Sequence, residues 1–226
     1  GRKRGADILY HNPYIDEYWG FETSPMELFS KVKAEKFDFA CTTNPGTVGL
    51  ATLYLAGIPL ISAPASPIKS NAYAGSYAFL KRLVCSVVFS LGSFVPGEHL
   101  KLLEPIGIKT NDVQFDLFFT PEGEKKVDEL FGENNIDPEK DFVVAIAPGG
   151  STDIRWWGRD KYAKLTDYLY QRYGAAIFLI GAGSDKKPID EMISHLDPQT
   201  KFVNLLNQPL DEFKAFLAKT HLVIGN

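Results

Sequence analysis

The sequence predicts an α/β protein built on parallel sheets, and three observations support this fold class. Short apolar runs that suit strands alternate along the whole chain with longer stretches whose apolar residues recur at helical spacing. Runs such as AAIFLI at 175–180 are continuously apolar, as expected of strands that are buried on both faces of a parallel sheet. Helix-length segments separate the strands, which is the pattern of right-handed β-α-β units.

Composition and charge narrow the class of protein. The chain has 226 residues, of which 45% are hydrophobic and 23% charged, as in ordinary soluble globular proteins. Its formal net charge of −4 includes no basic excess, so a nucleic-acid partner is not expected. The two cysteines, Cys41 and Cys85, form neither a disulfide framework nor a CxxC motif, which favours a reducing, cytoplasmic setting. The first residues lack the apolar core of a signal peptide.

In the first half of the chain, helix-capping residues, helix-ending glycines and the spacing of apolar residues predict the helices and strands. Ser24, Pro25 and Glu27 predict a helix start of the capping-box type, and apolar residues recur at helical spacing after it. Gly57 and Gly107 are placed to end two later helices. We expect strands at 37–43 and 58–64, and helices at 24–37, 46–57, about 73–91 and 98–107.

The most apolar segment of the chain lies at residues 83–95. It is too short to span a bilayer, which needs about 20 apolar residues. We interpret it as part of a buried core helix. An interfacial membrane helix is the alternative, because Lys81 and Arg82 stand directly before the segment.

In the second half of the chain, the expected strands and helices alternate more regularly. Thr120 and Pro121 predict another helix start, and the charged, proline-containing connector at 135–141 predicts a domain boundary. The sequence thus predicts an N-terminal domain at 1–135 and a C-terminal domain at 136–226, the second being a Rossmann-like layer sandwich. After the helix that follows Pro121, we expect strands at 142–148, 175–183, 201–206 and 221–226, and helices at 159–174, 187–196 and 209–220.

The last expected strand stops at Asn226 without a following helix. In doubly wound sheets, ligands bind outside the carboxyl ends of the strands. The sequence therefore stops where a binding loop is expected to begin, and we interpret the 226 residues as a fragment.

The loop PGGSTDIRWWG at 148–158 carries the strongest chemical signal. Gly149 and Gly150 allow a ligand to approach the main chain closely. Ser151 and Thr152 offer hydroxyl donors, and Arg155 offers a permanent planar cation that suits phosphate. The helix start that follows adds free amides and a partial positive charge. Together these groups suit a diphosphate.

A plain strand-to-helix loop is the alternative interpretation of the same residues. Asp160 is then only a helix cap, and Trp156 and Trp157 are packing residues. Composition alone does not decide between this interpretation and anion binding.

The stretch GAGSDK at 181–186 follows the next expected strand. It partly matches a dinucleotide-binding GxGxxG motif, but Lys186 stands where the third glycine belongs, and a lone partial match is weak. In a functional interpretation, Ser184 or Asp185 faces the ribose or base of a nucleotide. In the alternative, the turn is a helix cap with Pro188 in the first helical turn.

In order along the chain, these segments resemble glycosyltransferase family 9, the ADP-heptose:lipopolysaccharide heptosyltransferases. The resemblance covers nearly the whole chain, and the phosphate-loop stretch and the terminal LVIGN are its most specific parts. The segments that carry it are NPYIDEYWGF (12–21), EHLKLLEPIGI (98–108), VAIAPGGSTDIRWWGRDKYAKL (144–165), FLIGAGSD (178–185) and PLDEFKAFLAKTHLVIGN (209–226).

The resemblance implies a GT-B-like fold of two Rossmann-like domains. Here the N-terminal, acceptor-side domain lacks its first strand, and the C-terminal, donor-side domain is cut after its fourth strand. It also implies an inverting, metal-independent transfer of heptose, or a related sugar, from an ADP-sugar donor such as ADP-heptose to a lipopolysaccharide core or lipid A precursor acceptor. No cofactor is expected. The setting it implies is cytoplasmic, at the inner face of the inner membrane, with room for peripheral membrane contact.

Residue roles follow from the same resemblance. The loop at 149–155 matches the family's donor diphosphate site, in which Ser151, Thr152 and Arg155 take the hydroxyl and cationic positions. Arginine stands here where lysine is common. The acidic residue that contacts the donor nucleoside in the family maps near Asp185, next to Ser184.

The sequence departs from the family pattern in three places. The family's general base is an aspartate in a loop upstream of the first residue given, and its Asp-Ser/Thr-Gly-Pro stretch is expected beyond Asn226. We therefore expect no sugar transfer by this exact polypeptide. The basic residue that contacts the acidic acceptor sugar is also missing, since Thr47 and Val48 occupy that neighbourhood. The candidates to substitute for it are Lys69, Lys81 and Arg82, and the alternative is that each of them is a solvated surface charge.

Two other function classes stay open from the sequence. The chain is also compatible with a nucleotide-binding module that does no chemistry, either because it is a fragment or because its acceptor site has diverged. An NAD-dependent oxidoreductase rests on the partial glycine motif alone. No metal is expected, because the histidines share no metal-ligand spacing; they are His11, His99, His195 and His221.

Overall fold

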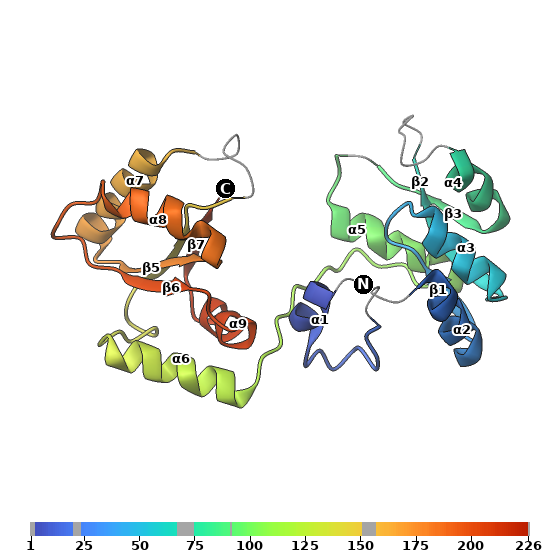
Figure 1. The fold of residues 1–226 in the computed structure, drawn as a ribbon, viewed down its shortest axis with the longest axis horizontal. Helices are drawn as coiled ribbons and strands as arrows, with labels where there is room; N and C mark the ends of the chain where they lie inside the picture. The colour runs from blue at the N-terminus through green and yellow to red at the C-terminus, as the bar shows by residue number, and fades with distance from the viewer. Residues whose placement is uncertain (1–2, 20–23, 67–74, 91, 151–156, 226) are drawn as a thin grey trace. The chain divides into compact units, whose positions relative to one another are not determined.

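The structure, a computed structural model, describes residues 3–19, 24–66, 75–90, 92–150 and 157–225. The chain forms two compact units (Figure 1). The first contains Tyr18–Asp116, and the second contains Arg4–Glu17 together with Leu117–Asn226. The units are therefore divided at 116/117, whereas the sequence predicted a domain boundary at 135/136.

The first unit is a parallel sheet covered by helices. β1 (Phe39–Cys41) pairs with β2 (Leu60–Ala65), and β2 pairs with β3 (Cys85–Val88), all in parallel. The strand order is β1-β2-β3. Its helical segments are α2 (Pro25–Glu35), α3 (Thr47–Leu55), α4 (Gly75–Leu80), η2 (Lys81–Leu83), α5 (Val95–Leu100) and η3 (Lys101–Ile106).

Helices α2, α3 and α4 share one core with β2. Val32 of α2, Leu50 of α3 and Tyr77 of α4 are buried together with Ile61 and Ala63 of β2. The Tyr77 hydroxyl, which is buried with this ring, donates a hydrogen bond of 2.8 Å to the carbonyl oxygen of Pro64. The ring thus fills the core while its polar end stays satisfied.

The helix predicted at about 73–91 is confirmed at Gly75–Leu80 and is wrong beyond Leu80. The chain leaves α4 at Leu80, makes the short 3-10 turn η2, and then runs as strand β3. The physical reason is local: Val87 and Val88 are β-branched and lose side-chain freedom in a helix, whereas they pair directly with Pro64 and Ala65 of β2. Both interpretations of residues 83–95, the buried core helix and the interfacial membrane helix, are therefore wrong, because this segment contains strand β3.

Several predicted caps are confirmed. The Ser24 hydroxyl accepts a hydrogen bond from the Glu27 amide, and the Thr120 hydroxyl accepts one from the Gly123 amide. Pro25 and Pro121 follow these caps at the first helical positions. Gly107 ends η3 with a φ of 84°, a left-handed conformation that glycine adopts without strain.

The second unit is a larger parallel sheet in the order β6-β5-β4-β7. All of its strand pairs are parallel, as the sequence predicted. The strands are β4 (Val143–Ala147), β5 (Ala176–Gly181), β6 (Val203–Leu206) and β7 (Leu222–Gly225). The helical segments are α1 (Lys3–Leu9), α6 (Pro121–Glu133), α7 (Arg159–Tyr173), η5 (Gly183–Asp185), α8 (Lys186–Ile193) and α9 (Leu210–Ala218).

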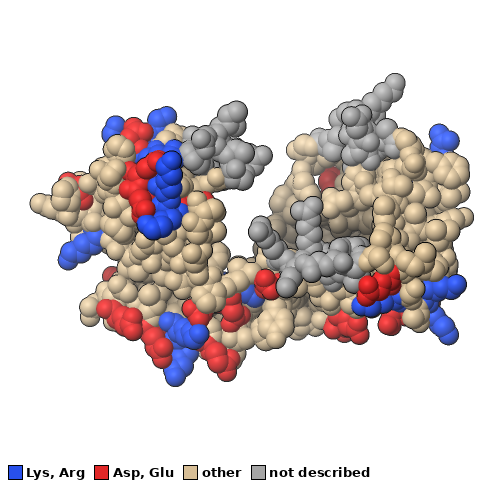
Figure 2. All heavy atoms as spheres, viewed as in Figure 1, with Lys and Arg blue, Asp and Glu red and all other residues tan. Residues whose placement is uncertain are grey.

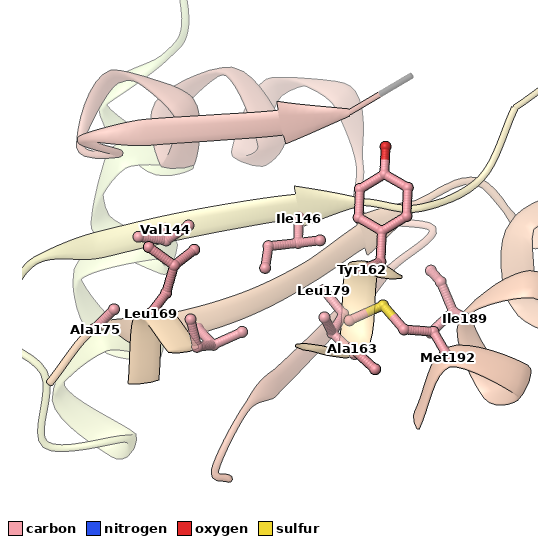
Figure 3. Close-up of a cluster of buried hydrophobic side chains, with 10 residues drawn as sticks. Val144, Ile146, Tyr162, Ala163, Leu169, Ala175, Leu179, Ile189 and Met192 are labelled. Carbon is pink, nitrogen blue, oxygen red and sulfur yellow. The ribbon is translucent and has the colours of Figure 1, made fainter. Parts of the chain in front are cut away.

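Side chains that alternate along the strands of this sheet fill two cores. Val144 and Leu179 point to the face covered by α7 and α8, where they pack with Tyr162 and Met192 (Figure 3). Neighbouring residues of the same strands, such as Phe178, point to the opposite face, which α6 and α9 cover. Burial on both faces explains why these strands read as continuous apolar runs.

Helix α6 belongs to this second unit because its apolar side is part of the core. Phe131 is buried, and its ring lies 5.5 Å from that of Phe178 and 6.1 Å from that of Phe216. Val127 is buried in the same cluster. A boundary at 135/136 would separate this helix from the sheet that buries it.

Asp211 of α9 joins the starts of α6 and α9. Its carboxylate accepts hydrogen bonds from the Thr120 amide at 3.2 Å and from the Thr120 hydroxyl at 2.6 Å. Lys214, whose side chain is only 3% exposed, has its Nζ 3.8 Å from Asp211 Oδ1. The same ammonium donates to the carbonyl oxygen of Tyr10 at 3.4 Å, so residues before the first unit also attach to the second.

The pKa of Asp211 lies below its ordinary value. Burial by itself raises this pKa, but the hydrogen bonds from Thr120 lower it, and the charges of Lys214 and His11 lower it further. A carboxyl group with a lowered folded-state pKa stabilises the fold at every pH above its unfolded-state pKa. It loses that contribution as the pH falls through its folded-state pKa.

Substitution Phe131→Ala is expected to lower the free energy of unfolding of the second unit by about 3–5 kcal/mol, the usual cost of deleting a buried aromatic ring. Denaturant unfolding followed by circular dichroism measures this change. Phe115→Ala is the control, because that ring is 75% exposed, and we expect a change within about 0.5 kcal/mol. Equal, small effects for both variants would contradict the placement of α6 in the core.

Substitution Asp211→Asn is expected to make the free energy of unfolding depend less steeply on pH in the acidic range. The unmodified protein should lose stability as the pH falls below about 4, near the ordinary Asp pKa, while the variant lacks that contribution and changes less. Urea unfolding at a series of pH values measures the slope. Asp160→Asn, at an exposed position of α7, should keep the original slope; a slope unchanged in Asp211→Asn would refute the assignment.

Candidate functional site

The loops that carry the candidate site leave one edge of the second sheet. β4, β5 and β6 are parallel neighbours, so their carboxyl ends lie at the same edge. Pro148–Gly150 follow β4, η5 follows β5, and Asn207 and Gln208 follow β6. This is the edge at which α/β sheets bind ligands.

Gly149 and Asp185 come together at this edge, although 36 positions separate them in the sequence. A Cβ atom placed on Gly149 would lie 2.3 Å from Oδ1 and 2.5 Å from Cγ of Asp185. No real side chain tolerates such distances, so only glycine fits beneath this carboxylate. The structure thus joins the two stretches that the sequence singled out separately.

The turn η5 holds the Asp185 side chain in place. Its Oδ2 accepts a hydrogen bond of 2.9 Å from the Ala182 amide, and its own amide donates to the Ala182 carbonyl at 2.9 Å. A Cβ atom on Gly181 would lie 2.9 Å from the Asp185 Cβ, so this glycine also makes room for the aspartate. Asp185 is therefore fixed against the loop that follows β4.

Asn207 was not singled out from the sequence. It has a left-handed backbone with a φ of 56°, which asparagine tolerates better than most residues. Its amide donates to the Gly181 carbonyl at 3.0 Å, and its side-chain nitrogen lies 2.9 Å from where a Cβ of Gly183 would be. The sequence could have indicated Asn207 as a candidate by its position alone, because it directly follows the third strand whose carboxyl end lies at this edge.

A hollow of about 380 Å³ opens beside these loops. Its walls are mainly apolar, and its polar side chains are the amides of Asn207 and Gln208. An apolar hollow with a few polar groups is the usual character of a small-molecule site. The lining residues are Ala147, Ile180, Gly181, Ala182, Leu205, Asn207, Gln208 and Phe213.

Three of the predicted diphosphate contacts, Ser151, Thr152 and Arg155, lie outside the described residues, as does Trp156. Gly149 and Gly150 are described and stand at the carboxyl end of β4. Ser184 is exposed within η5. The structure therefore brings Gly149, Gly150, Ser184 and Asp185 to one edge, and the sequence places the other three residues in the loop that continues from Gly150.

The start of α7 corrects one alternative interpretation. The N-cap is Gly158, with a φ of 117°, so the interpretation of Asp160 as the cap is wrong, and Asp160 lies in the first helical turn. Trp157 packs its ring edge against Tyr162 at 5.3 Å, which is a packing role. Arg159 forms an ion pair with Glu191 of α8, which joins the helices that follow β4 and β5.

Within the described parts of the chain, no group of three or more His, Cys, Asp and Glu side chains is arranged to hold a metal ion. In the same parts, no helix has the length and apolar character needed to cross a bilayer.

Comparison with known proteins identifies relatives of this chain. Residues 99–226 match the sequence model described as "Glycosyltransferase family 9 (heptosyltransferase)". "Lipopolysaccharide heptosyltransferase 3" of Escherichia coli (strain K12) is 22% identical over 189 residues, which cover 79% of this chain and 52% of that protein. The chain thus spans about half the length of this curated relative.

Two solved structures resemble the whole chain. The glycosyl transferase family 9 from Veillonella parvula DSM 2008 has a TM-score of 0.77 at 15% identity, and the match covers 100% of this chain and 65% of that one. The E. coli ADP-heptose lps heptosyltransferase II has a TM-score of 0.69 at 15% identity, covering 100% and 68%. The predicted α/β, GT-B-like fold with parallel sheets is confirmed.

Substitution Gly149→Ala is expected to destabilise the second unit by about 1–3 kcal/mol, because the added methyl group overlaps the Asp185 carboxylate. Thermal unfolding measures the loss. Gly132→Ala in α6 is the control, because nothing lies within 4 Å of its added Cβ, and it should be neutral or stabilising. The double variant Gly149→Ala/Asp185→Ala should recover part of the loss, and no recovery would contradict the contact.

Proposed function

Because the chain belongs to glycosyltransferase family 9 (heptosyltransferase), we propose that it is the donor-binding part, with much of the acceptor side, of an enzyme that transfers heptose or a related sugar. The proposed donor is an ADP-sugar such as ADP-heptose. The proposed acceptor is a lipopolysaccharide core or lipid A precursor. The relatives named above motivate both assignments.

The observation that carries this proposal is the packing of Asp185 over Gly149 at the carboxyl edge of the second sheet. It joins the loop after β4, proposed to hold phosphates, to the turn after β5, proposed to face the nucleoside. The two stretches resemble the family separately in sequence, and they meet at the edge where parallel sheets bind nucleotides. The adjoining hollow supplies apolar walls for the remainder of the ligand.

In the proposed site, Gly149 and Gly150 leave space for the diphosphate beside the main chain. Ser151 and Thr152 donate hydroxyl hydrogen bonds, and Arg155 supplies the cation. The amino end of α7, whose first turn contains Arg159 and Asp160, adds the positive end of the helix dipole. Ser184 and Asp185 are proposed to face the donor nucleoside.

The proposed reaction inverts the anomeric centre and uses no metal ion. An acceptor hydroxyl attacks the anomeric carbon, its bond to the diphosphate oxygen breaks, and ADP leaves with the bonding electron pair. The hydroxyl proton passes to a carboxylate that acts as general base. Charge that develops on the leaving diphosphate is proposed to be stabilised by Arg155 and by main-chain amides of the same loop, which is electrostatic stabilisation of the leaving group.

The proposed setting follows from the proposed acceptor, which is a lipid-anchored sugar. We propose that the enzyme acts in the cytoplasm at the inner face of the inner membrane. A peripheral contact with that membrane would bring the acceptor to the protein.

Substitution Arg155→Ala tests the diphosphate site. Loss of one charge-assisted hydrogen bond, worth about 1.5–3 kcal/mol, should weaken ADP binding by at least about tenfold. Isothermal titration calorimetry measures the affinity, and Arg172→Ala, in the last turn of α7, is the control. ADP and ADP-heptose should bind in preference to NAD; preference for NAD, or equal ADP affinity in both variants, would contradict the proposal. Transfer itself is measured with the protein extended at both ends.

A further inference from the structure

A long stretch of the first unit contains no acidic residue. Between Asp38 and Glu98 the sequence has no Asp or Glu, although the whole chain has 28 such residues and a net charge of −4. The same stretch contains the cations Lys69, Lys81 and Arg82. Lys69 lies outside the described residues, whereas Lys81 and Arg82 are described.

This stretch forms α3, β2, α4, η2 and β3. Helix α3 has no charged residue, and its buried side contributes Leu50 to the core that it shares with Tyr77 of α4. The two helices are neighbours in that core. Because α3 and α4 contact one another, their exposed side chains lie on neighbouring parts of the surface of the unit.

Large apolar side chains cover the outer sides of these helices. Leu55 is 68% exposed, Phe79 63% and Val48 60%. In the view of Figure 2, no acidic residue is seen over α3 and α4. We call this region the α3–α4 surface, and its members are Val48, Tyr54, Leu55, Phe79, Lys81, Arg82 and Leu83.

The two cations of the α3–α4 surface differ from most other basic residues of the described chain. The ion pairs found there use lysines and an arginine elsewhere, and none involves Lys81 or Arg82. Phe79 and Leu83 flank them at four residues' separation. Positive charge that is not matched by a carboxylate therefore stands directly among exposed apolar side chains.

We infer that the α3–α4 surface docks onto an anionic lipid bilayer. Apolar side chains gain free energy by leaving water for the interface between headgroups and acyl chains, and adjacent cations are attracted to anionic headgroups. The absence of acidic residues removes the repulsion that such a membrane would exert. Nucleic acid is a poorer match, because aliphatic side chains such as Leu55 and Val48 offer neither stacking nor hydrogen bonds.

This inference deepens the peripheral membrane contact proposed above and rests on that proposal for its setting, while its own evidence is the exposure and charge of the α3–α4 surface. It assigns the surface that meets the lipid and the sign of that lipid's charge. The test below omits donor and acceptor, so its outcome is independent of the test at Arg155.

Co-sedimentation with phosphatidylcholine vesicles, with and without phosphatidylglycerol, tests the docking surface. The 226-residue chain should bind the anionic vesicles and bind the zwitterionic ones far more weakly. Lys81→Gln/Arg82→Gln should weaken binding about 30-fold, because each cation near an anionic surface contributes about a factor of five. Its affinity should also depend less on salt.

The apolar contribution is tested with Leu55→Ser/Phe79→Ser, which should bind anionic vesicles at least about tenfold more weakly. Matched controls lie in the second unit: Lys125→Gln/Lys164→Gln removes two exposed cations, and Tyr168→Ser removes an exposed ring. Both should bind vesicles as the unmodified chain does. Circular dichroism and thermal unfolding confirm that each variant is folded.

Three outcomes would overturn the inference. The first is no binding to anionic vesicles by the folded chain. The second is equal loss of binding in the control variants. The third is self-association that Leu55→Ser/Phe79→Ser abolishes without any effect on vesicle binding, which would assign the surface to a second copy of the chain.

Discussion

Parallel pairing of β4 with β5 and β6 is the constraint on which the candidate site depends. It delivers three loops from distant parts of the sequence to one edge, where they must share a small volume. Glycine is the residue that makes this sharing feasible: Gly149 and Gly181 leave the space that Asp185 occupies, and Gly183 leaves the space beside Asn207. A side chain at any of these glycines would overlap a neighbouring loop. The close approach of the loops at the candidate site therefore depends on glycine at these positions.

The rigidity of this edge comes from cores on both faces of the sheet. Helices α7 and α8 cover one face, and α6 and α9 cover the other. Helix α6 precedes the predicted domain boundary at 135/136 in the sequence. Its Phe131 ring packs against the Phe178 ring and so attaches the helix to the second sheet. Asp211 then ties the beginning of α6 to the beginning of α9 through Thr120.

Charge is used differently in the two units. In the described residues of the second unit, lysines are largely matched by carboxylates, as at Lys219 with Asp128 and Glu124. In the first unit, the region of α3 and α4 has apolar exposure and unmatched cations. In the proposals made above, the second unit binds the diphosphate of the donor, and the α3–α4 surface of the first unit meets an anionic lipid layer. For the proposed transferase, whose acceptor is proposed to be anchored in lipid, these two proposed roles are complementary.

The sequence by itself determined the fold class, most strands and the caps at Ser24 and Thr120, because these depend on local periodicity and on hydrogen bonds that span three residues. It also identified Gly149, Gly150, Ser184 and Asp185 as candidates. The tertiary structure decided that β3 replaces the expected helix, since pairing with β2 outweighs local helical spacing. It decided that α6 belongs to the second unit, and that Asp185 lies on Gly149 with Asn207 nearby. Such contacts depend on the order of the strands in the sheet. A local sequence pattern does not contain that order, so it cannot show which loops lie close together in the folded protein.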